Sequence, residues 1–340
     1  MWTITLLAAF LTGFATWAMT RMVLEMLRER DIMDRPNDRS SHGAPVPRGG
    51  GLAIVTIALP SWFILCWFTG TLAHMWPVLA GALVLAAISW WDDIKDLPAL
   101  PRFGAQILAV AFVLSLLPEN VLLFDGLVPI WVERALLAVA WIWFINLYNF
   151  MDGIDGMTGA ETIAIAGGLA ILILDHVSRQ GGDWSQAALA AVLAGGAAGF
   201  LVLNWHPARI FLGDVGSVTL GFLLGFLLIW QAAAMGHWMA ALLLPLYYWG
   251  DATTTLVMRM ARGGKFWRPH RDHAYQAAIM GGRDHAWVVK RVSLVNILLV
   301  ACAYASLMGG WLAWIALVVG MVTVAGFLWY LRSQNRAETA

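Results

Sequence analysis

Long apolar stretches alternate with short polar gaps along the whole chain, and this alternation predicts an all-α polytopic membrane protein. A helix needs about 20 mainly apolar residues to cross the hydrocarbon core of a bilayer. About eleven stretches meet or approach that length, the fourth being short: 3–25, 51–69, 76–92, 103–117, 133–150, 159–175, 187–204, 217–235, 237–257, 289–308 and 311–331. No linker or low-complexity tract interrupts them. We therefore expect a single integral-membrane domain over residues 1–340 with about eleven transmembrane helices.

The basic residues are concentrated in every second gap between the apolar stretches. Of the 21 Lys and Arg residues, only Arg134 and Arg179 fall on the opposite side. Basic residues favour the cytoplasmic side of a membrane, and the first apolar run lacks the basic start of a signal peptide. We predict a multi-pass membrane protein with its N-terminus outside and its C-terminus in the cytoplasm. The gaps on the cytoplasmic side are then 26–50, 92–102, 151–158, 205–216, 258–288 and the C-terminal tail.

Composition supports this interpretation. The chain is 60% hydrophobic and 12% charged, whereas about a quarter of the residues of a soluble domain are charged. The net charge is zero, and we expect no nucleic-acid partner. Cys66 and Cys302 both lie in apolar stretches, so we expect buried thiols rather than a disulfide or a zinc site.

Acidic residues gather at the ends of the predicted cytoplasmic gaps. Asp92 and Asp93 close the third stretch, where the helix dipole is already negative and two carboxylates need a compensating cation. Asp214 precedes the eighth stretch, a position that suits either an N-cap or a Mg²⁺–phosphate site. These aspartates therefore indicate a site for a cation and phosphate, with a solvated helix end as the alternative.

A glycine-rich motif, NLYNFMDGIDGMTG, covers residues 146–159. Asp152 and Asp155 are three residues apart and share a face if the turn is helical. Asn146 and Asn149 place two amide groups at the membrane edge. We interpret the motif as a binding loop, with a plain connection between helices as the alternative.

The longest cytoplasmic gap is strongly basic and contains His270, Arg271 and His273. Imidazole and guanidinium groups bind phosphate through charged hydrogen bonds. A metal site built from the two histidines has weak support, since no third ligand is near. Asp251 is an acid within a predicted span and needs a function or a partner, for which Arg259 is a candidate.

The N-terminal gap ends in three glycines after Arg48, within DRPNDRSSHGAPVPRGGG at residues 34–51. Such glycines suit a loop that binds phosphate, and they equally suit close packing of helices.

Taken in order, these motifs resemble those of the polyprenyl-phosphate N-acetylhexosamine-1-phosphate transferases. The matching elements are DRP..R..H...VPR.GG, the Asp92–Asp93 pair, N..NF.DGIDG, FLGD.GS and a histidine in the fifth cytoplasmic loop. The chain departs from the family in its last loop, where Ala274 and Tyr275 follow His273 in place of a His-x-His run. The pattern PHRDHAYQ is similar to the branch that initiates O-antigen or related surface glycans. Whether His270 replaces the second histidine stays open.

The resemblance implies transfer of HexNAc-1-phosphate from a UDP-sugar to undecaprenyl phosphate, with release of UMP. It implies Mg²⁺ as cofactor, with Mn²⁺ as an alternative ion, because the metal offsets the repulsion between two anionic substrates. The donor stays open between UDP-GlcNAc and a 6-deoxy relative such as UDP-FucNAc or UDP-QuiNAc. A homodimer and a two-step route through a covalent carboxylate stay open as well.

The resemblance also implies roles for individual residues. Asp214 and one of Asp92–Asp93, which we take as Asp93, would hold Mg²⁺, and the other aspartate would deprotonate or position the lipid phosphate. The remaining side chains would act on the substrates: His273 as a catalytic and phosphate-binding group, and Arg48, Asn146, Asn149, Asp152, Asp155, His270 and Arg271 in binding. The competing interpretation is a secondary transporter, although transporters place ionisable residues near the midplane and show internal repeats.

Overall fold

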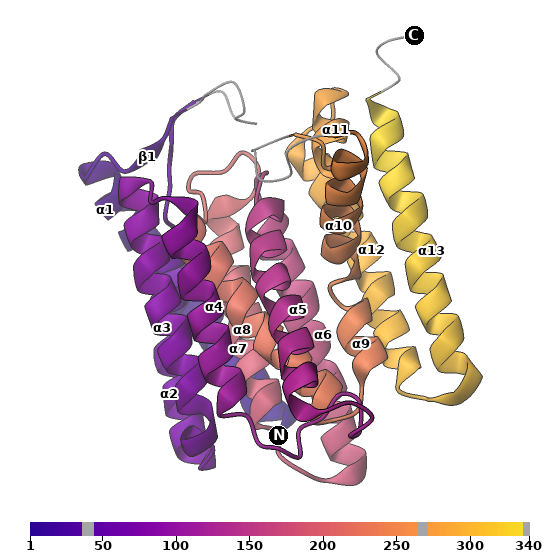
Figure 1. The fold of residues 1–340 in the computed structure, drawn as a ribbon. Helices are drawn as coiled ribbons and strands as arrows, with labels where there is room; N and C mark the ends of the chain where they lie inside the picture. Colours follow the sequence, from indigo (N-terminus) through magenta and orange to yellow (C-terminus); the bar gives the residue numbers. More distant parts are fainter. Residues whose placement is uncertain (36–43, 264–270, 336–340) are drawn as a thin grey trace.

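The computed structural model describes residues 1–35, 44–263 and 271–335, and nearly all of this is helical (Figure 1). Within the described residues, nine helices are long and apolar enough to cross a membrane. They are α1 (Trp2–Glu29), α2 (Gly51–Thr69), α3 (Leu72–Lys95), α5 (Ile130–Met151), α6 (Met157–Gln180), α7 (Ser185–Asn204), α8 (Asp214–Ala233), α12 (His285–Ser306) and α13 (Gly310–Gln334). The prediction of an all-α polytopic membrane protein is confirmed.

The other two predicted spans differ from a simple membrane helix. The fourth is α4 (Ala99–Ser115), a shorter apolar helix of 17 residues. The ninth, predicted as continuous over 237–257, is divided into α9 (Trp238–Leu243) and α10 (Leu246–Ala261), with Pro245 between them. Proline has no backbone N–H and clashes with the preceding helical turn, so the helix breaks there. A short helix, α11 (Ala274–Met280), follows α10.

The start of α1 and the end of α13 lie at opposite ends of the helix bundle (Figure 1). This agrees with an odd number of crossings, in which α4 and the α9–α10 pair each count as one. The β1 strand, α11 and the end of α13 lie together at the upper end of the view. The assignment of this end to the cytoplasm stays a prediction.

The centre of the molecule is α8. Of its most apolar 18-residue window, 89% is buried, compared with 78% for α6 and for α7. Helices α3 and α5 pack against α8, and α1 packs against α7. Glycines in α8 allow this close enclosure: a Cβ atom on Gly225 would lie 2.4 Å from Trp141 Cδ1, and one on Gly221 would lie 3.1 Å from Ile145 Cα. Small residues of this kind favour close helix packing in lipid.

Small residues allow α1 and α7 to approach closely. A Cβ atom on Gly195 would lie 2.1 Å from the carbonyl oxygen of Ala9, and one on Gly199 would lie 2.0 Å from that of Gly13. Backbone contact of this kind is a common basis of helix packing in lipid.

A short hairpin places the N-terminal polar segment beside the start of α8. Strands β1 (Met33–Asp34) and β2 (Val46–Pro47) pair antiparallel. Beyond β2, Phe211 N–H donates to the Pro47 carbonyl at 2.8 Å and Gly51 N–H to the Leu212 carbonyl at 2.7 Å. A Cβ on Gly51 would lie 2.2 Å from Gly216 Cα, so this glycine serves close packing against α8.

Candidate active site

Carboxylates from two distant segments share one guanidinium group. Asp92 lies near the end of α3, and Asp214 is the first residue of α8. Arg102 Nη1 donates to Asp92 Oδ2 at 2.5 Å and to Asp214 Oδ2 at 2.9 Å. Both aspartates are buried. The expected compensating cation is therefore a protein side chain in this structure.

Asp93 holds the start of α8 in place. Its Oδ1 accepts from Asp214 N–H at 2.9 Å and its Oδ2 from Val215 N–H at 3.0 Å, satisfying N–H groups that lack partners within the helix. Gly213 precedes them with φ of +74°, and a Cβ there would lie 2.7 Å from Asp93 Oδ2. Glycine at this position thus permits both the left-handed turn and the approach of the carboxylate.

Arg48 links the N-terminal segment to the same carboxylates. Its Nε lies 3.0 Å from Asp93 Oδ1, and its Nη2 lies 2.9 Å from Asp214 Oδ1. Burial alone would lower the pKa of Arg48, but the charges of Asp93 and Asp214 raise it above the usual range. Arg48 is therefore permanently charged.

The glycine-rich motif approaches this group from the end of α5. Asn149 Nδ2 donates to Asp214 Oδ2 at 3.3 Å, and Asn149 Oδ1 accepts from Ser217 Oγ at 3.0 Å. Asp152 follows the last residue of α5, and burial raises its pKa to about 7, with the charges of Asp214 and Asp93 adding to the effect.

The structure thus brings five predicted site residues into contact: Asp92, Asp93, Asp214, Arg48 and Asn149. Arg102 completes this cluster, hereafter the acid site, and sequence analysis missed it. A single arginine in a cytoplasmic gap is typical positive-inside charge. The only signal was its place in the same short gap as the aspartate pair.

Asp155 belongs to a separate cluster with two histidines. His206 Nδ1 lies 2.6 Å and His285 Nδ1 lies 3.2 Å from Asp155 Oδ2, which also accepts from Ala208 N–H at 3.1 Å. Burial would raise the pKa of Asp155, but the hydrogen bonds of His285 and His206 lower it to about 2.

One ligand atom from each of these three side chains lies within 4.8 Å of the others, and two histidines with a carboxylate are a set that can bind a transition metal. Sequence analysis missed both histidines because they are 79 positions apart in the chain.

Asn146 faces away from the acid site. Its Nδ2 donates to Gln106 Oε1 at 2.7 Å and to the Ile142 carbonyl at 2.8 Å. These contacts join α5 to α4. The role of Asn146 in substrate binding stays a prediction.

The last cytoplasmic gap reaches the site through α11. His270 lies outside the described residues. His273 is buried at the start of α11, with Nδ1 3.7 Å from Asp251 Oδ1. Tyr275 Oη donates to the Phe150 carbonyl at 3.3 Å, at the end of α5. Arg271 lies on a neighbouring pocket.

The predicted pairing of Asp251 with Arg259 is wrong. Asp251 accepts from the N–H groups of Ala274 and Tyr275 and lies 3.7 Å from Arg332 Nη2. Arg259 instead contacts Asp272 at 2.7 Å. Helix α13 packs beside α10, and the order of the helices in the sequence did not predict this contact.

The donor set of the acid site fits a magnesium ion. Mg²⁺ binds through carboxylate oxygens, and Asp92 Oδ2 and Asp214 Oδ2 already contact one cationic nitrogen. Both oxygens of Asp93 accept backbone N–H groups, and Oδ1 also contacts Arg48. Asp92 and Asp214 are therefore the pair whose oxygens lie around a single cationic atom.

The fold and the acid site define a class: a polytopic α-helical membrane protein with a carboxylate–guanidinium site at one end of its helices. Residues 75–232, which include Asp92, Asp93, Asn149 and Asp214, match the family described as glycosyl transferase family 4. This match covers just under half of the chain, and together with the relatives described next it supports the resemblance to the polyprenyl-phosphate N-acetylhexosamine-1-phosphate transferases.

Relatives extend the similarity over most of the chain. The decaprenyl-phosphate N-acetylglucosaminephosphotransferase of Mycobacterium tuberculosis is 28% identical, covering 94% of this chain and 86% of the relative. The corresponding protein of Mycobacterium leprae is 26% identical, covering 85% and 79%. A probable undecaprenyl-phosphate N-acetylglucosaminyl 1-phosphate transferase of Bacillus subtilis is 26% identical, covering 86% and 82%.

Proposed function

We propose that the protein transfers HexNAc-1-phosphate from a UDP-N-acetylhexosamine to undecaprenyl phosphate at the cytoplasmic face of a bacterial inner membrane, releasing UMP. The observation that carries this proposal is the contact of Asp92, Asp93 and Asp214 with Arg48 and Arg102 at one end of the spanning helices. The printed names of the relatives support transfer of a sugar phosphate to a polyprenyl phosphate.

The location follows from the substrates. The lipid tail of the acceptor stays in the bilayer, so its phosphate reaches only the edge of the membrane, and the UDP-sugar arrives from water. Asp214 begins a spanning helix, and Asp92 lies near the end of another. A site formed by helix ends is thus accessible to both substrates.

We assign Asp92 and Asp214 as the residues that would hold Mg²⁺, in place of the pair Asp93 and Asp214 expected from the sequence. Bound there, Mg²⁺ would neutralise diphosphate charge and stabilise UMP as the leaving group. Asp93 positions the first turn of α8. Arg48 and Arg102 supply fixed positive charge for the two anionic substrates. Within the described residues, the buried Nε of Arg102 has no acceptor, and a substrate phosphate oxygen would provide one.

The glycine-rich motif and α11 would bind the donor. Asn149 and Asp152 lie beside the acid site, on the side where we place the uridine and sugar together with Asp155. Helix α11 contacts the end of α5 through Tyr275, and we place His273, at the start of α11, with Arg271 at the phosphates. The surface-glycan pathway, including O-antigen initiation, is part of this proposal through the PHRDHAYQ pattern.

The test is UMP release by the purified full-length protein with undecaprenyl phosphate and Mg²⁺. The donor panel is UDP-GlcNAc, UDP-QuiNAc and UDP-FucNAc. We expect one donor to be preferred, EDTA to abolish turnover, and Asp214→Asn to lower it at least a hundredfold, in line with the loss of a group that stabilises transition-state charge.

Asp31→Asn is the matched control, because Asp31 is exposed and pairs only with nearby Arg35 in the described part of the chain. Full turnover by Asp214→Asn would remove Asp214 from the metal site. Absence of UMP release with every donor would reject the transferase function itself.

A further inference from the structure

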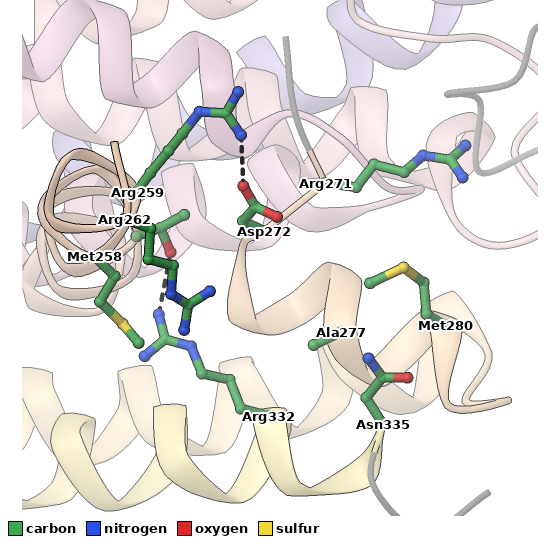
Figure 2. A pocket seen from close by; sticks show the side chains of 10 residues that line it. Met258, Arg259, Arg262, Arg271, Asp272, Ala277, Met280, Arg332 and Asn335 are labelled. Carbon is green, nitrogen blue, oxygen red and sulfur yellow. Dashed lines mark hydrogen bonds and ion pairs between the residues drawn. The ribbon is translucent and has the colours of Figure 1, made fainter. Parts of the chain in front are cut away.

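A second site lies between the ends of α10 and α13 and the start of α11 (Figure 2). It is a cavity of about 470 Å³ that we call the arginine pocket. Its lining residues come from all three helices and their flanking segments. The ones used below are Met258, Arg259, Arg262, Ala277, Met280 and Arg332.

The arginine pocket carries an excess of positive charge. Four arginines and a single aspartate line it. Figure 2 shows the Arg271 side chain directed away from the other three arginines, which leaves it to the donor phosphates proposed above. Arg259 contacts that aspartate, Asp272, at 2.7 Å. Arg332 Nη2 donates to Thr255 Oγ1 at 3.1 Å and lies 3.7 Å from Asp251 Oδ1, so its charge is only partly compensated, since Asp251 is shared with His273. Arg262 is exposed and makes no ion pair with a described residue. Guanidinium groups in this arrangement favour a phosphate group.

The pocket also has an apolar side. Met258, Ala277 and Met280 line it together with the arginines. The helix surface next to Arg332 carries Trp329, which is 72% exposed, and Tyr330. Exposed aromatic residues at a helix end are typical of the membrane–water interface. The pocket therefore lies where a ligand with an anionic head and an apolar body would be found.

Helix α11 separates the pocket from the acid site. The side chains of Tyr275 and His273 face α5 and Asp251, whereas Ala277 and Met280 face the pocket. An anion in the pocket would thus have no contact with the catalytic carboxylates.

We propose that the arginine pocket binds the phosphate headgroup of an anionic membrane lipid. Basic pockets between transmembrane helices on the cytoplasmic side commonly hold such headgroups. A free phosphate ester has the same charged chemistry, but it would leave the apolar side of the pocket unused. The lipid would bridge Arg262 on α10 and Arg332 on α13, and it would hold α11 between them.

The test uses purified full-length protein in neutral detergent and two lipids with matched acyl chains, phosphatidylglycerol and phosphatidylcholine. Bound lipid is counted by native mass spectrometry, and the thermal unfolding midpoint is measured at each lipid concentration. We expect phosphatidylglycerol to bind at least tenfold more tightly than phosphatidylcholine. The double variant Arg262→Gln/Arg332→Gln should lose this preference, at about fivefold for each arginine removed.

Two controls keep the result specific. Arg28→Gln removes the same charge from the last turn of α1, and it should preserve the preference for phosphatidylglycerol. The single variant Arg262→Gln leaves the contact of Arg332 with Thr255 intact, so it provides a test even if the double variant folds poorly. It should lose about half of the preference for phosphatidylglycerol on a logarithmic scale.

Three results would overturn the proposal. The wild-type protein could bind both lipids equally. The Arg262→Gln variant could retain the full preference. Glycerol 3-phosphate alone could compete with phosphatidylglycerol at equal concentration, which would make the pocket a site for soluble phosphate esters. None of these outcomes depends on whether the protein transfers a sugar phosphate.

Discussion

Arg102 shows how one side chain stabilises two acidic residues. Its Nη1 contacts Asp92 and Asp214, which themselves interact directly. Two nearby carboxylates repel each other unless one is protonated or a cation lies between them. The arginine supplies that cation.

Replacing Arg102 tests this arrangement. We expect Arg102→Ala to lower the rate of UMP release about a hundredfold, because removal of one donor that stabilises developing negative charge costs about 10²–10³ in kcat. Arg102→Lys keeps the positive charge, and it should reduce the rate of UMP release by a smaller factor. The control Arg28→Ala changes an exposed arginine at the end of α1 and should match the wild type. An Arg102→Ala protein of normal rate would show that the contact is dispensable.

The lowered pKa of Asp155 predicts how the stability of the fold depends on pH. Its pKa is about 2 in the folded protein, below the ordinary value of 3.8. A carboxyl whose pKa is lower in the folded state stabilises the fold above the unfolded pKa, and this contribution disappears as the pH falls from about 4 to 2. Asp155→Asn should therefore lower the free energy of unfolding by about 2 kcal/mol at pH 6. The deficit relative to the wild type should shrink below pH 4, as measured by thermal unfolding in detergent, and a constant deficit would contradict the assignment.

At the scale of elements, contacts between backbones decide the arrangement. Helix α1 approaches α7 at Gly195 and Gly199, and α2 approaches α8 at Gly51 and Gly216. In lipid, helices gain little from burying apolar side chains, so close packing of small residues contributes more to their association. The second approach also fixes Arg48, which precedes α2, beside the first turn of α8.

A matched pair of glycine substitutions tests this packing. In Gly195→Ala the new methyl group would meet the Ala9 carbonyl at 2.1 Å, whereas in Gly167→Ala it would meet nothing within 4 Å. We expect Gly195→Ala to lower the free energy of unfolding by about 1–3 kcal/mol. Gly167→Ala should raise it by about 0.5–1 kcal/mol, because alanine is the better helix former. Equal effects of the two substitutions in thermal unfolding would show that the α1–α7 contact is not limiting.

At the scale of the whole molecule, the acid site lies at one end of the helix bundle and the N-terminus at the other (Figure 1). The segments that form the site are the hairpin after α1, the end of α3, the start of α4, the end of α5 and the start of α8. Each of these is a gap that the positive-inside pattern places in the cytoplasm.

Cysteine labelling tests this orientation. Lys95 ends α3 at the acid-site end, and Glu119 follows α4 at the opposite end; both are exposed. Both native cysteines are buried. In intact cells, a membrane-impermeant maleimide should label Glu119→Cys at once and Lys95→Cys only after permeabilisation. The reverse pattern would invert the topology.

The sequence by itself predicted most of the architecture and much of the site. Apolar length and basic gaps are local properties, so they predicted the nine long spanning helices of the described residues and identified Asp92, Asp93 and Asp214 at helix ends. The break at Pro245 was also visible in the chain, but proline occurs within the continuous helices α2 and α3 as well. The presence of a proline in the sequence therefore did not decide whether the ninth span was broken.

Only the tertiary structure decided which charges meet. Periodicity along one helix does not report the rotation or depth of its neighbours, and side chains 100 or more positions apart meet only after the helices pack. The structure therefore paired Arg102 with Asp214, separated Asp155 from the acid site, and joined Arg332 to the pocket beside α10. The sequence of a segment determines whether that segment forms a membrane helix, whereas a site between helices depends on how several of them pack together.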